Sequence, residues 1–190
     1  GASFGGSLNM KTVDGRAKSG MDTDRSSVEL AFNGGMYNTF REMINTHIVL
    51  PDNRWKANAR FSKVNSDGFL YRTGSDLYSY YGDMGWYGDK TQVIARLFGG
   101  SEKTGMGWDG VDYNTAYGID GADRRYNPAG EYITTAADGS DSTAYYSNQS
   151  DNYAQQHAQL FINHRFTPQW SLSATAHYTH GAGYYEQYKR

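Results

Sequence analysis

The 190-residue chain contains no cysteine, only three prolines and no long apolar run. Without cysteine, the chain forms neither a disulfide scaffold nor a thiolate metal site. No segment approaches the roughly 18 apolar residues that a membrane-spanning helix needs. Lys and Arg together number 18 and Asp and Glu number 20. This balance lacks the basic excess that is typical of nucleic-acid-binding proteins.

The chain is also poor in the residues that fill ordinary protein cores. Leu, Ile, Val and Phe together make up about 15% of the sequence, below the roughly 20% under which chains often stay disordered. A formal net charge of only −2 and the presence of 17 tyrosines argue against disorder. The apolar surface must therefore come from aromatic rings, alanine and close packing at the 23 glycines.

Alternation of apolar and polar residues is the main pattern that is present. In residues 170–178 the even positions are Trp, Leu, Ala, Ala and Tyr, and the odd positions are Ser, Ser, Thr and His. A period of two indicates a strand with one apolar and one polar face. The same pattern predicts seven strands, at residues 27–37, 39–50, 55–63, 76–87, 91–103, 153–166 and 170–178.

The predicted connections alternate in length. Residues 51–54, 88–89 and 167–169 are short turns, whereas 65–75 and 104–152 are long, with the short connection at 37–39 as the exception on that side. We therefore expect an all-β fold, an antiparallel up-and-down meander of about seven long strands. Four residues break the alternation: Glu42 and Thr46 fall on the apolar face, and Ile94 and Phe98 fall on the polar face.

Two architectures can accommodate such a meander. A soluble barrel or sandwich turns its apolar face inward, and a transmembrane barrel turns it toward lipid. Here alanine occupies mid-strand positions, and rings flank the short turns, as an aromatic girdle requires. These rings are Trp55, Trp86, Tyr87, Phe166 and Trp170.

The predicted strand length and the polar faces also favour a membrane. Residues 170–178 extend over roughly 26 Å, or roughly 20 Å when tilted by about 40°, close to a bilayer's apolar band of about 25 Å. The polar faces carry too much charge for a dry core. The sequence thus favours a transmembrane barrel, and because seven strands are fewer than the smallest known barrel uses, we expect a piece of a larger one.

Several segments resemble the TonB-dependent outer-membrane receptors. Ser3-Phe-Gly-Gly-Ser-Leu-Asn-Met-Lys-Thr12 resembles the last strand of that family's plug domain. Similar segments follow in the family's order along essentially the whole chain. They are Gly34-Gly-Met-Tyr-Asn-Thr-Phe-Arg41, Arg60-Phe-Ser-Lys-Val-Asn-Ser-Asp-Gly-Phe-Leu-Tyr-Arg72, Arg124-Arg-Tyr-Asn-Pro-Ala-Gly-Glu131 and His180-Gly-Ala-Gly-Tyr-Tyr-Glu-Gln-Tyr-Lys189.

The resemblance implies a domain organisation and a function. Residues 1–20 would be the end of the plug and a linker, and residues 21–190 the N-terminal portion of a 22-stranded transmembrane β-barrel with a long extracellular loop at about 104–152. The family takes up scarce ligands (iron–siderophores, haem, cobalamin or oligosaccharides), so we expect a transporter and not an enzyme, with no cofactor. The expected location is the outer membrane of a Gram-negative bacterium.

The same resemblance implies partners. They are outer-membrane lipid, the protein's own plug and remaining barrel strands, a small-molecule or glycan ligand, and the TonB complex, which would act through an N-terminal segment that this sequence does not include. No nucleic acid is expected. In isolation the chain would expose its lipid face, so we expect it to self-associate.

Two groups of candidate site residues follow. The long loop offers aromatic and basic side chains suited to sugars, macrocycles and anionic siderophores, namely Trp108, Tyr113, Tyr117, Arg124, Arg125 and Tyr126. The polar strand faces offer lumen residues that would contact the plug, namely Lys56, Arg60, Arg96, Gln155 and Arg165. The same loop residues can instead serve only to pack the loop or to meet lipopolysaccharide.

No metal site is predicted. The five histidines are scattered, and His177 and His180 lie three apart, which places them on opposite faces of a strand. Six loop aspartates could hold calcium, but their spacing matches no 12-residue calcium loop. Asn127-Pro128 with Gly130 predicts a turn.

Two other functions remain open on the sequence. A soluble, aromatic-rich β-sandwich that binds carbohydrate would require Ala174 and Ala176 to be buried in a protein core. A β-fold glycosidase would require two carboxylates facing each other across a cleft, and no Asp or Glu pair has a recognisable setting of that kind.

Overall fold

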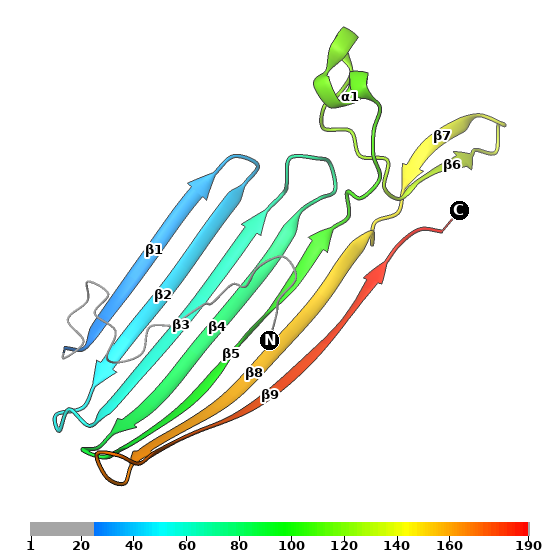
Figure 1. Cartoon of the computed structure of the whole chain (residues 1–190). Coiled ribbons are helices and arrows are strands. Elements are labelled where there is room, and N and C mark those ends of the chain that lie inside the picture. Colours follow the sequence, from blue (N-terminus) through cyan, green and yellow to red (C-terminus); the bar gives the residue numbers. More distant parts are fainter. Residues whose placement is uncertain (1–24, 190) are drawn as a thin grey trace.

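A computed structural model describes residues 25–189, which form a seven-stranded antiparallel sheet and a separate two-stranded hairpin (Figure 1). The sheet follows the order β1-β2-β3-β4-β5-β8-β9, so the predicted all-β meander is confirmed. The predicted end of the plug, at residues 1–20, lies outside the described residues. The strands of the sheet are β1 (Ser27–Gly35), β2 (Thr39–Val49), β3 (Trp55–Ser66), β4 (Ser75–Tyr87), β5 (Thr91–Gly105), β8 (Ser150–Arg165) and β9 (Ser171–Glu186).

The cross-strand register sorts alternate residues onto two faces. Partners that lie opposite each other in an antiparallel pair project to the same side of the sheet. One such row carries apolar residues across six strands: Ile48, Ala57, Met84, Ala95, Leu160 and Ala176. We call the side of the sheet that contains this row the apolar face and the opposite side the polar face.

Within residues 25–189, no protein layer packs against the apolar face. Leu30 and Phe32 on β1 are 61% and 64% exposed, and Tyr178 on β9 is 64% exposed. Among residues 25–189, the buried apolar residues are Ile94, Met106 and Ala129. The described part of the chain therefore lacks the hydrophobic core that normally holds a sheet in a folded domain.

No helix within residues 25–189 is both long enough and apolar enough to cross a membrane.

The two ends of the sheet differ in their connections (Figure 1). The β2–β3, β4–β5 and β8–β9 turns lie together at one end, which we call the turn end. The β1–β2 turn and the two long loops lie at the other, which we call the loop end. The β1–β2 turn covers residues 36–38 and is longer than the sequence predicted: β1 ends at Gly35, two residues before its predicted end, and Tyr37 and Asn38 adopt positive φ angles of 58° and 52°.

The long loop at the loop end is more ordered than the sequence indicated. It runs over residues 106–149, because β5 and β8 extend slightly into the predicted 104–152 segment. It contains the helix α1 (Tyr113–Tyr117), the 3₁₀ turn η1 (Ile119–Gly121) and the hairpin of β6 (Glu131–Thr135) and β7 (Asp141–Tyr145). These elements are too short and too polar to show a period in the sequence.

Neighbouring strands account for most of the breaks in the alternation. Glu42 pairs in register with Lys63, whose Nζ lies 3.8 Å from Asp76 Oδ1, so charged residues group together at the loop end of the apolar face. On the polar face Ile94 is buried, and the ring of Phe98 stacks on His157 with centroids 4.6 Å apart.

Candidate functional site

A row of polar side chains crosses the polar face of the sheet. It includes one residue from each of six neighbouring strands, and all six belong to one continuous cross-strand register. In strand order they are His47, Asn58, Asp83, Arg96, Gln159 and His177. We refer to this set as the polar row.

Asp83 is the centre of the polar row. Its side chain is buried, and its carboxylate accepts hydrogen bonds from Asn58 Nδ2 at 2.8 Å and from the hydroxyl of Tyr81. Arg96 Nε lies 4.0 Å from Asp83 Oδ2, and Arg96 Nη1 donates to Gln159 Oε1 at 3.5 Å. A buried carboxylate is stable only with such donors and an opposite charge. From His47 to Gln159 the row is therefore a connected polar network.

The five predicted lumen residues all project from the polar face, which confirms their common side. They differ in burial: Lys56 and Arg96 are covered, Gln155 is half-buried, and Arg60 and Arg165 are exposed. Of the five, only Arg96 belongs to the polar row. Contact between these residues and a plug domain stays a prediction.

Arg125 anchors the long loop on the loop that follows β3. Its Nε donates to the carbonyl oxygen of Phe69 at 2.9 Å, and its guanidinium carbon lies 4.6 Å from the ring centroid of Tyr71 and 5.1 Å from that of Tyr37. Such cation–π contacts contribute about 0.5–1 kcal/mol each at exposed sites. Arg125 is thus engaged in packing the loop, which was one of the two roles considered for it.

Asn127 is the most completely buried polar side chain of the loop, with 1% of its surface exposed. Its Nδ2 donates to the carbonyl oxygens of Tyr71 and Met106, both at 2.9 Å, and its Oδ1 accepts from the Ala129 amide at 3.0 Å. Arg72 also donates to the Asn127 carbonyl. Asn127 therefore ties together two loops that lie far apart in the sequence.

The predicted turn around Pro128 is confirmed. The Glu131 amide donates to the Pro128 carbonyl at 3.1 Å, and Gly130 has a φ of 74°, which a residue with a Cβ rarely adopts. The burial of Asn127 is a further role that the sequence did not indicate, because the Asn-Pro dipeptide signals only the turn.

Four of the predicted ligand-binding residues are exposed. Tyr113 and Tyr117 stand one turn apart on α1 with ring centroids 4.6 Å apart, and Arg124 lies beside Gly118. Trp108, 65% exposed, faces the ring of Tyr185 at 5.9 Å. The structure does not gather the six predicted residues into one site, and Trp108 lies beside a cavity through its contact with the lining residue Tyr185.

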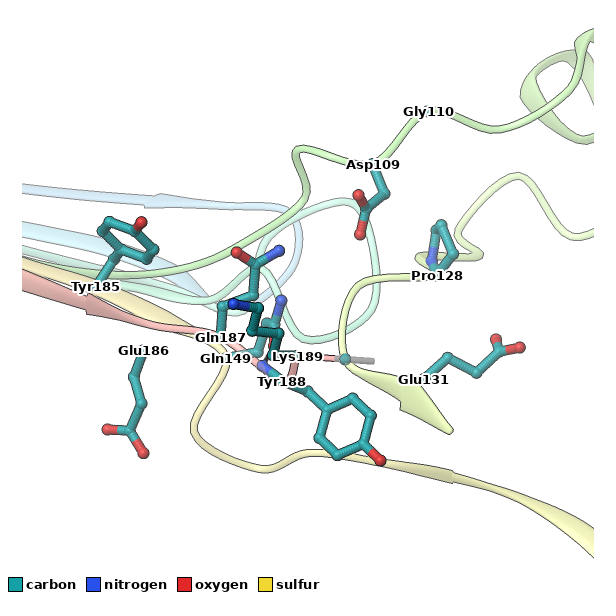
Figure 2. A pocket seen from close by; sticks show the side chains of 11 residues that line it. Asp109, Gly110, Pro128, Glu131, Gln149, Tyr185, Glu186, Gln187, Tyr188 and Lys189 are labelled. Atoms are coloured by element: carbon teal, nitrogen blue, oxygen red, sulfur yellow. Dashed lines mark hydrogen bonds between the residues drawn. The ribbon is translucent and has the colours of Figure 1, made fainter. Parts of the chain in front are cut away.

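That cavity, of about 920 Å³, opens at the loop end between the long loop and the last residues of β9 (Figure 2). Figure 2 shows side chains that come from four separate segments of the chain. They are Asp109, Pro128, Glu131, Gln149, Tyr185, Glu186, Gln187, Tyr188 and Lys189, with Gly110 and Gly130 completing the lining.

The cavity lining combines aromatic rings with hydrogen-bonding groups. The Tyr188 ring stacks on Tyr132 with centroids 4.9 Å apart, and the Tyr188 amide donates to Gln149 Oε1 at 3.0 Å. Carboxylates are contributed by Glu131 and Glu186. Rings together with carboxylates and amides suit a ligand that is rich in hydroxyl groups.

Two tyrosine–glutamate pairs stand at the edge of this cavity. Tyr126 donates to Glu131, and this hydrogen bond, together with burial and the glutamate charge, raises the pKa of Tyr126 to about 12. Tyr146 donates to Glu186, which raises the pKa of Tyr146 above its ordinary value. Both tyrosines are therefore hydrogen-bond donors at neutral pH, and each orients a carboxylate that lines the cavity.

The loop aspartates mostly serve their own backbone. Asp112 caps α1 through the Thr115 hydroxyl and amide, which lowers the pKa of its carboxyl group. Asp123 accepts from the Arg125 amide, and Asp138 from Ser140. Across the described residues, no three His, Asp or Glu side chains converge on a common metal position.

No family model, curated protein or solved structure matches the chain.

Most cavity residues could not have been found from the sequence. They come from segments around residues 109, 129, 149 and 187, and only the fold brings these together. The one available signal was Trp108, an isolated ring in a polar segment next to Asp109 and Gly110. For the polar row, alternation in the sequence predicted the face on which its residues lie but not the register that places them opposite one another.

Proposed function

We propose that the chain is part of a transmembrane β-barrel of the outer membrane, whose apolar face contacts lipid and whose polar face lines the lumen. The barrel is a TonB-dependent receptor that takes up a scarce ligand through its outer loops. One observation supports this most strongly. The apolar face of the sheet is exposed, whereas the polar face covers a carboxylate, Asp83, and a guanidinium, Arg96.

The distribution of side chains along the apolar face supports a lipid neighbour. At the turn end, Trp55 and Trp86 are register partners, and Trp170 lies next to the last turn. Their rings occupy the level that an interfacial aromatic girdle requires. Between these rings and the loop end, the apolar face carries mostly alanine, leucine, isoleucine, methionine and further rings, with Thr46, Gly82 and Gly99 among them.

At the loop end, charged residues replace the apolar residues of the apolar face. Glu42, Lys63, Asp76 and Lys103 lie on four adjacent strands with alternating sign, and Asp76 pairs in register with Lys103. Charged side chains are costly at the bilayer centre but not at its polar boundary. The charges and the aromatic rings thus mark the two limits of an apolar band.

The alternative, a soluble β-sandwich, requires the apolar face to be buried in a protein core, which is not observed within residues 25–189. Ala174 and Ala176 are exposed, and among residues 25–189 no second sheet packs against the apolar face. In water, so large an apolar surface would drive association.

Single-cysteine labelling tests the orientation, because this chain contributes no native cysteine. Ala176→Cys and Thr175→Cys are neighbours on opposite faces of β9 and form a matched pair. With a nitroxide label in outer membranes, we expect position 176 to collide more often with oxygen, which concentrates in lipid. We expect position 175 to collide more often with a water-soluble nickel chelate.

The reverse accessibility, or equal protection of both labels from both reagents, would contradict a lipid-facing apolar side. Protection at 176 with a protein found in the soluble fraction would instead support the sandwich.

Ligand capture at the cavity is tested separately. In cells that depend on the receptor for iron, cobalamin or a glycan, Trp108→Ala is expected to reduce uptake about ten-fold or more, as loss of a binding ring does. Tyr113→Ala removes an equally exposed ring of the same loop that faces Tyr117, whereas Trp108 faces the cavity residue Tyr185, and it serves as the control. Equal uptake by both variants would remove the cavity from the proposal and leave the lipid assignment intact.

A further inference from the structure

Two histidines on the polar face lie close together although they are 20 residues apart in the sequence. His157 is on β8 and His177 on β9, and their nitrogens Nδ1 and Nε2 are 3.4 Å apart. Thr179 is the register partner of His157. Its hydroxyl oxygen lies 2.9 Å from His157 Nδ1 and 2.9 Å from His177 Nε2. Three donor atoms therefore converge on one point of the sheet.

From this convergence we propose that His157 and His177 form a cross-strand binding site for a divalent first-row transition metal such as Cu²⁺, Ni²⁺ or Zn²⁺, with the Thr179 hydroxyl beside it. This inference depends only on the register of β8 and β9 and is independent of the proposed function.

The distance between the nitrogens fits metal binding. Imidazole nitrogens bind zinc at about 2.0–2.1 Å, so two of them at a tetrahedral angle lie roughly 3.3–3.4 Å apart. The two nitrogens are therefore already at the separation that a shared ion requires, and with 27° between the ring planes a rotation of the exposed His177 ring would direct both lone pairs at one point. For a direct N–H···N hydrogen bond the same distance is long.

One of the two rings is already held in place. Phe98 stacks on His157 with an interplanar angle of 16°, and His157 is half-buried. His177 is exposed, so the bound ion would keep positions open to water or to a donor atom of another molecule. A fixed ligand next to open positions is the arrangement of a metal site that exchanges its remaining ligands.

The ligand set indicates which ions bind. Imidazole suits copper, nickel and zinc, whereas magnesium and calcium require carboxylate and carbonyl oxygens. The carboxylate of the polar row, Asp83, is engaged by Asn58, Tyr81 and Arg96. No third His, Asp or Glu of residues 25–189 completes the set, so selectivity against Mg²⁺ and Ca²⁺ should be strong.

Without metal, the same three groups can form a hydrogen-bonded chain from one imidazole through the hydroxyl to the other. The sequence did not reveal either arrangement, because it showed only that His177 and His180 face opposite sides. The pairing with His157 arises from the β8–β9 register, which places the two histidines on diagonal positions.

Copper titration of the full protein in detergent tests the proposal. With CuCl₂ as the probe, we expect one Cu²⁺ per chain whose electron paramagnetic resonance spectrum shows splitting from two imidazole nitrogens. His177→Gln and His157→Gln should each weaken binding at least about ten-fold and remove one nitrogen from the spectrum. MgCl₂ and CaCl₂ should not compete.

His180→Gln is the matched control, because it lies on the same strand but on the apolar face. Loss of binding only in the 157 and 177 variants would support the site. Equal binding in all three variants, or a spectrum without nitrogen splitting, would overturn it and leave a hydrogen-bonded chain. His177 is exposed, so its variant is expected to fold even if His157→Gln does not.

Discussion

The two faces of the seven-stranded sheet are built from alternate residues of the same strands, yet they differ in how far their side chains are exposed. On the polar face Asp83 and Arg96 are covered and bonded, whereas on the apolar face Leu30 and Tyr178 are more than half exposed. In a water-soluble protein the apolar face would be the covered one. In the described part of the sheet, polar side chains are covered and apolar ones are exposed, which is what the proposed contact of the apolar face with lipid would require.

The largest expected effect is on the polar face. Asp83→Leu would leave Arg96 buried without its counter-charge and take the acceptor from Asn58 and Tyr81. Removing one partner of a buried ion pair costs about 3–5 kcal/mol. We expect a loss of that order in the free energy of unfolding, measured by guanidinium titration in lipid vesicles.

Asp83→Asn, which keeps an acceptor oxygen, should reduce the free energy of unfolding by less than Asp83→Leu does. If Asp83→Leu unfolds at the same guanidinium concentration as the parent protein, the polar row does not stabilise the sheet. The covered charges of the polar face would then have no role in holding the strands together.

A charge on the apolar face should have the next largest effect. Ala176→Arg would place a guanidinium at mid-strand among Leu160 and its neighbours, and such a charge in a membrane barrel costs about 2–4 kcal/mol near the bilayer midplane. Its matched variant is Thr175→Arg, one residue away on the polar face. We expect the first to reduce the fraction of folded protein in the outer membrane and the second to leave it close to normal. Equal amounts of the two variants in the membrane would argue against lipid contact at Ala176.

Asn127→Ala should loosen the loop end and leave both faces unchanged. The change removes an acceptor and two donated hydrogen bonds and leaves the Tyr71 and Met106 carbonyls unpaired, which costs about 1–3 kcal/mol. We expect proteolysis within residues 106–149 to become several-fold faster, while the strands stay protected. Asn114→Ala, at an exposed position of α1, is the control. An unchanged cleavage rate would show that the loop is held elsewhere.

The smallest expected effect is a change in stability with pH, caused by the titration of Tyr126 in the long loop. Because Glu131 raises the pKa of Tyr126 to about 12, the folded state keeps this proton more tightly than the unfolded state does. The resulting stabilisation is complete below the ordinary pKa of about 10 and is lost as the pH rises through about 12. Glu131→Gln should lower the pKa of Tyr126 toward 10, read from tyrosinate absorbance after subtracting the Tyr126→Phe spectrum. No change would exclude Glu131 as the cause.

Alternation predicted all seven strands of the sheet and the face of each lumen residue. It failed where the physical signal is weak. The β6–β7 hairpin has five-residue strands without an apolar face. Alternation placed Tyr37 in the first strand, whereas it lies in the turn, because a positive φ angle leaves no mark on a hydropathy pattern. The predicted loop residues were spread over exposed and packed positions, since an aromatic or basic side chain suits either role.

The strands, their two faces and the unequal length of the connections were predictable from the residues, because they depend on local periodicity and turn residues. Which residues meet follows from the fold: Asp83 with Arg96, Asn127 with Tyr71, His157 with His177, and four distant segments around one cavity. A strand's period is visible within a few residues. The register between strands is set by the pairing of whole chains of backbone hydrogen bonds, and a shift of one residue would exchange every contact.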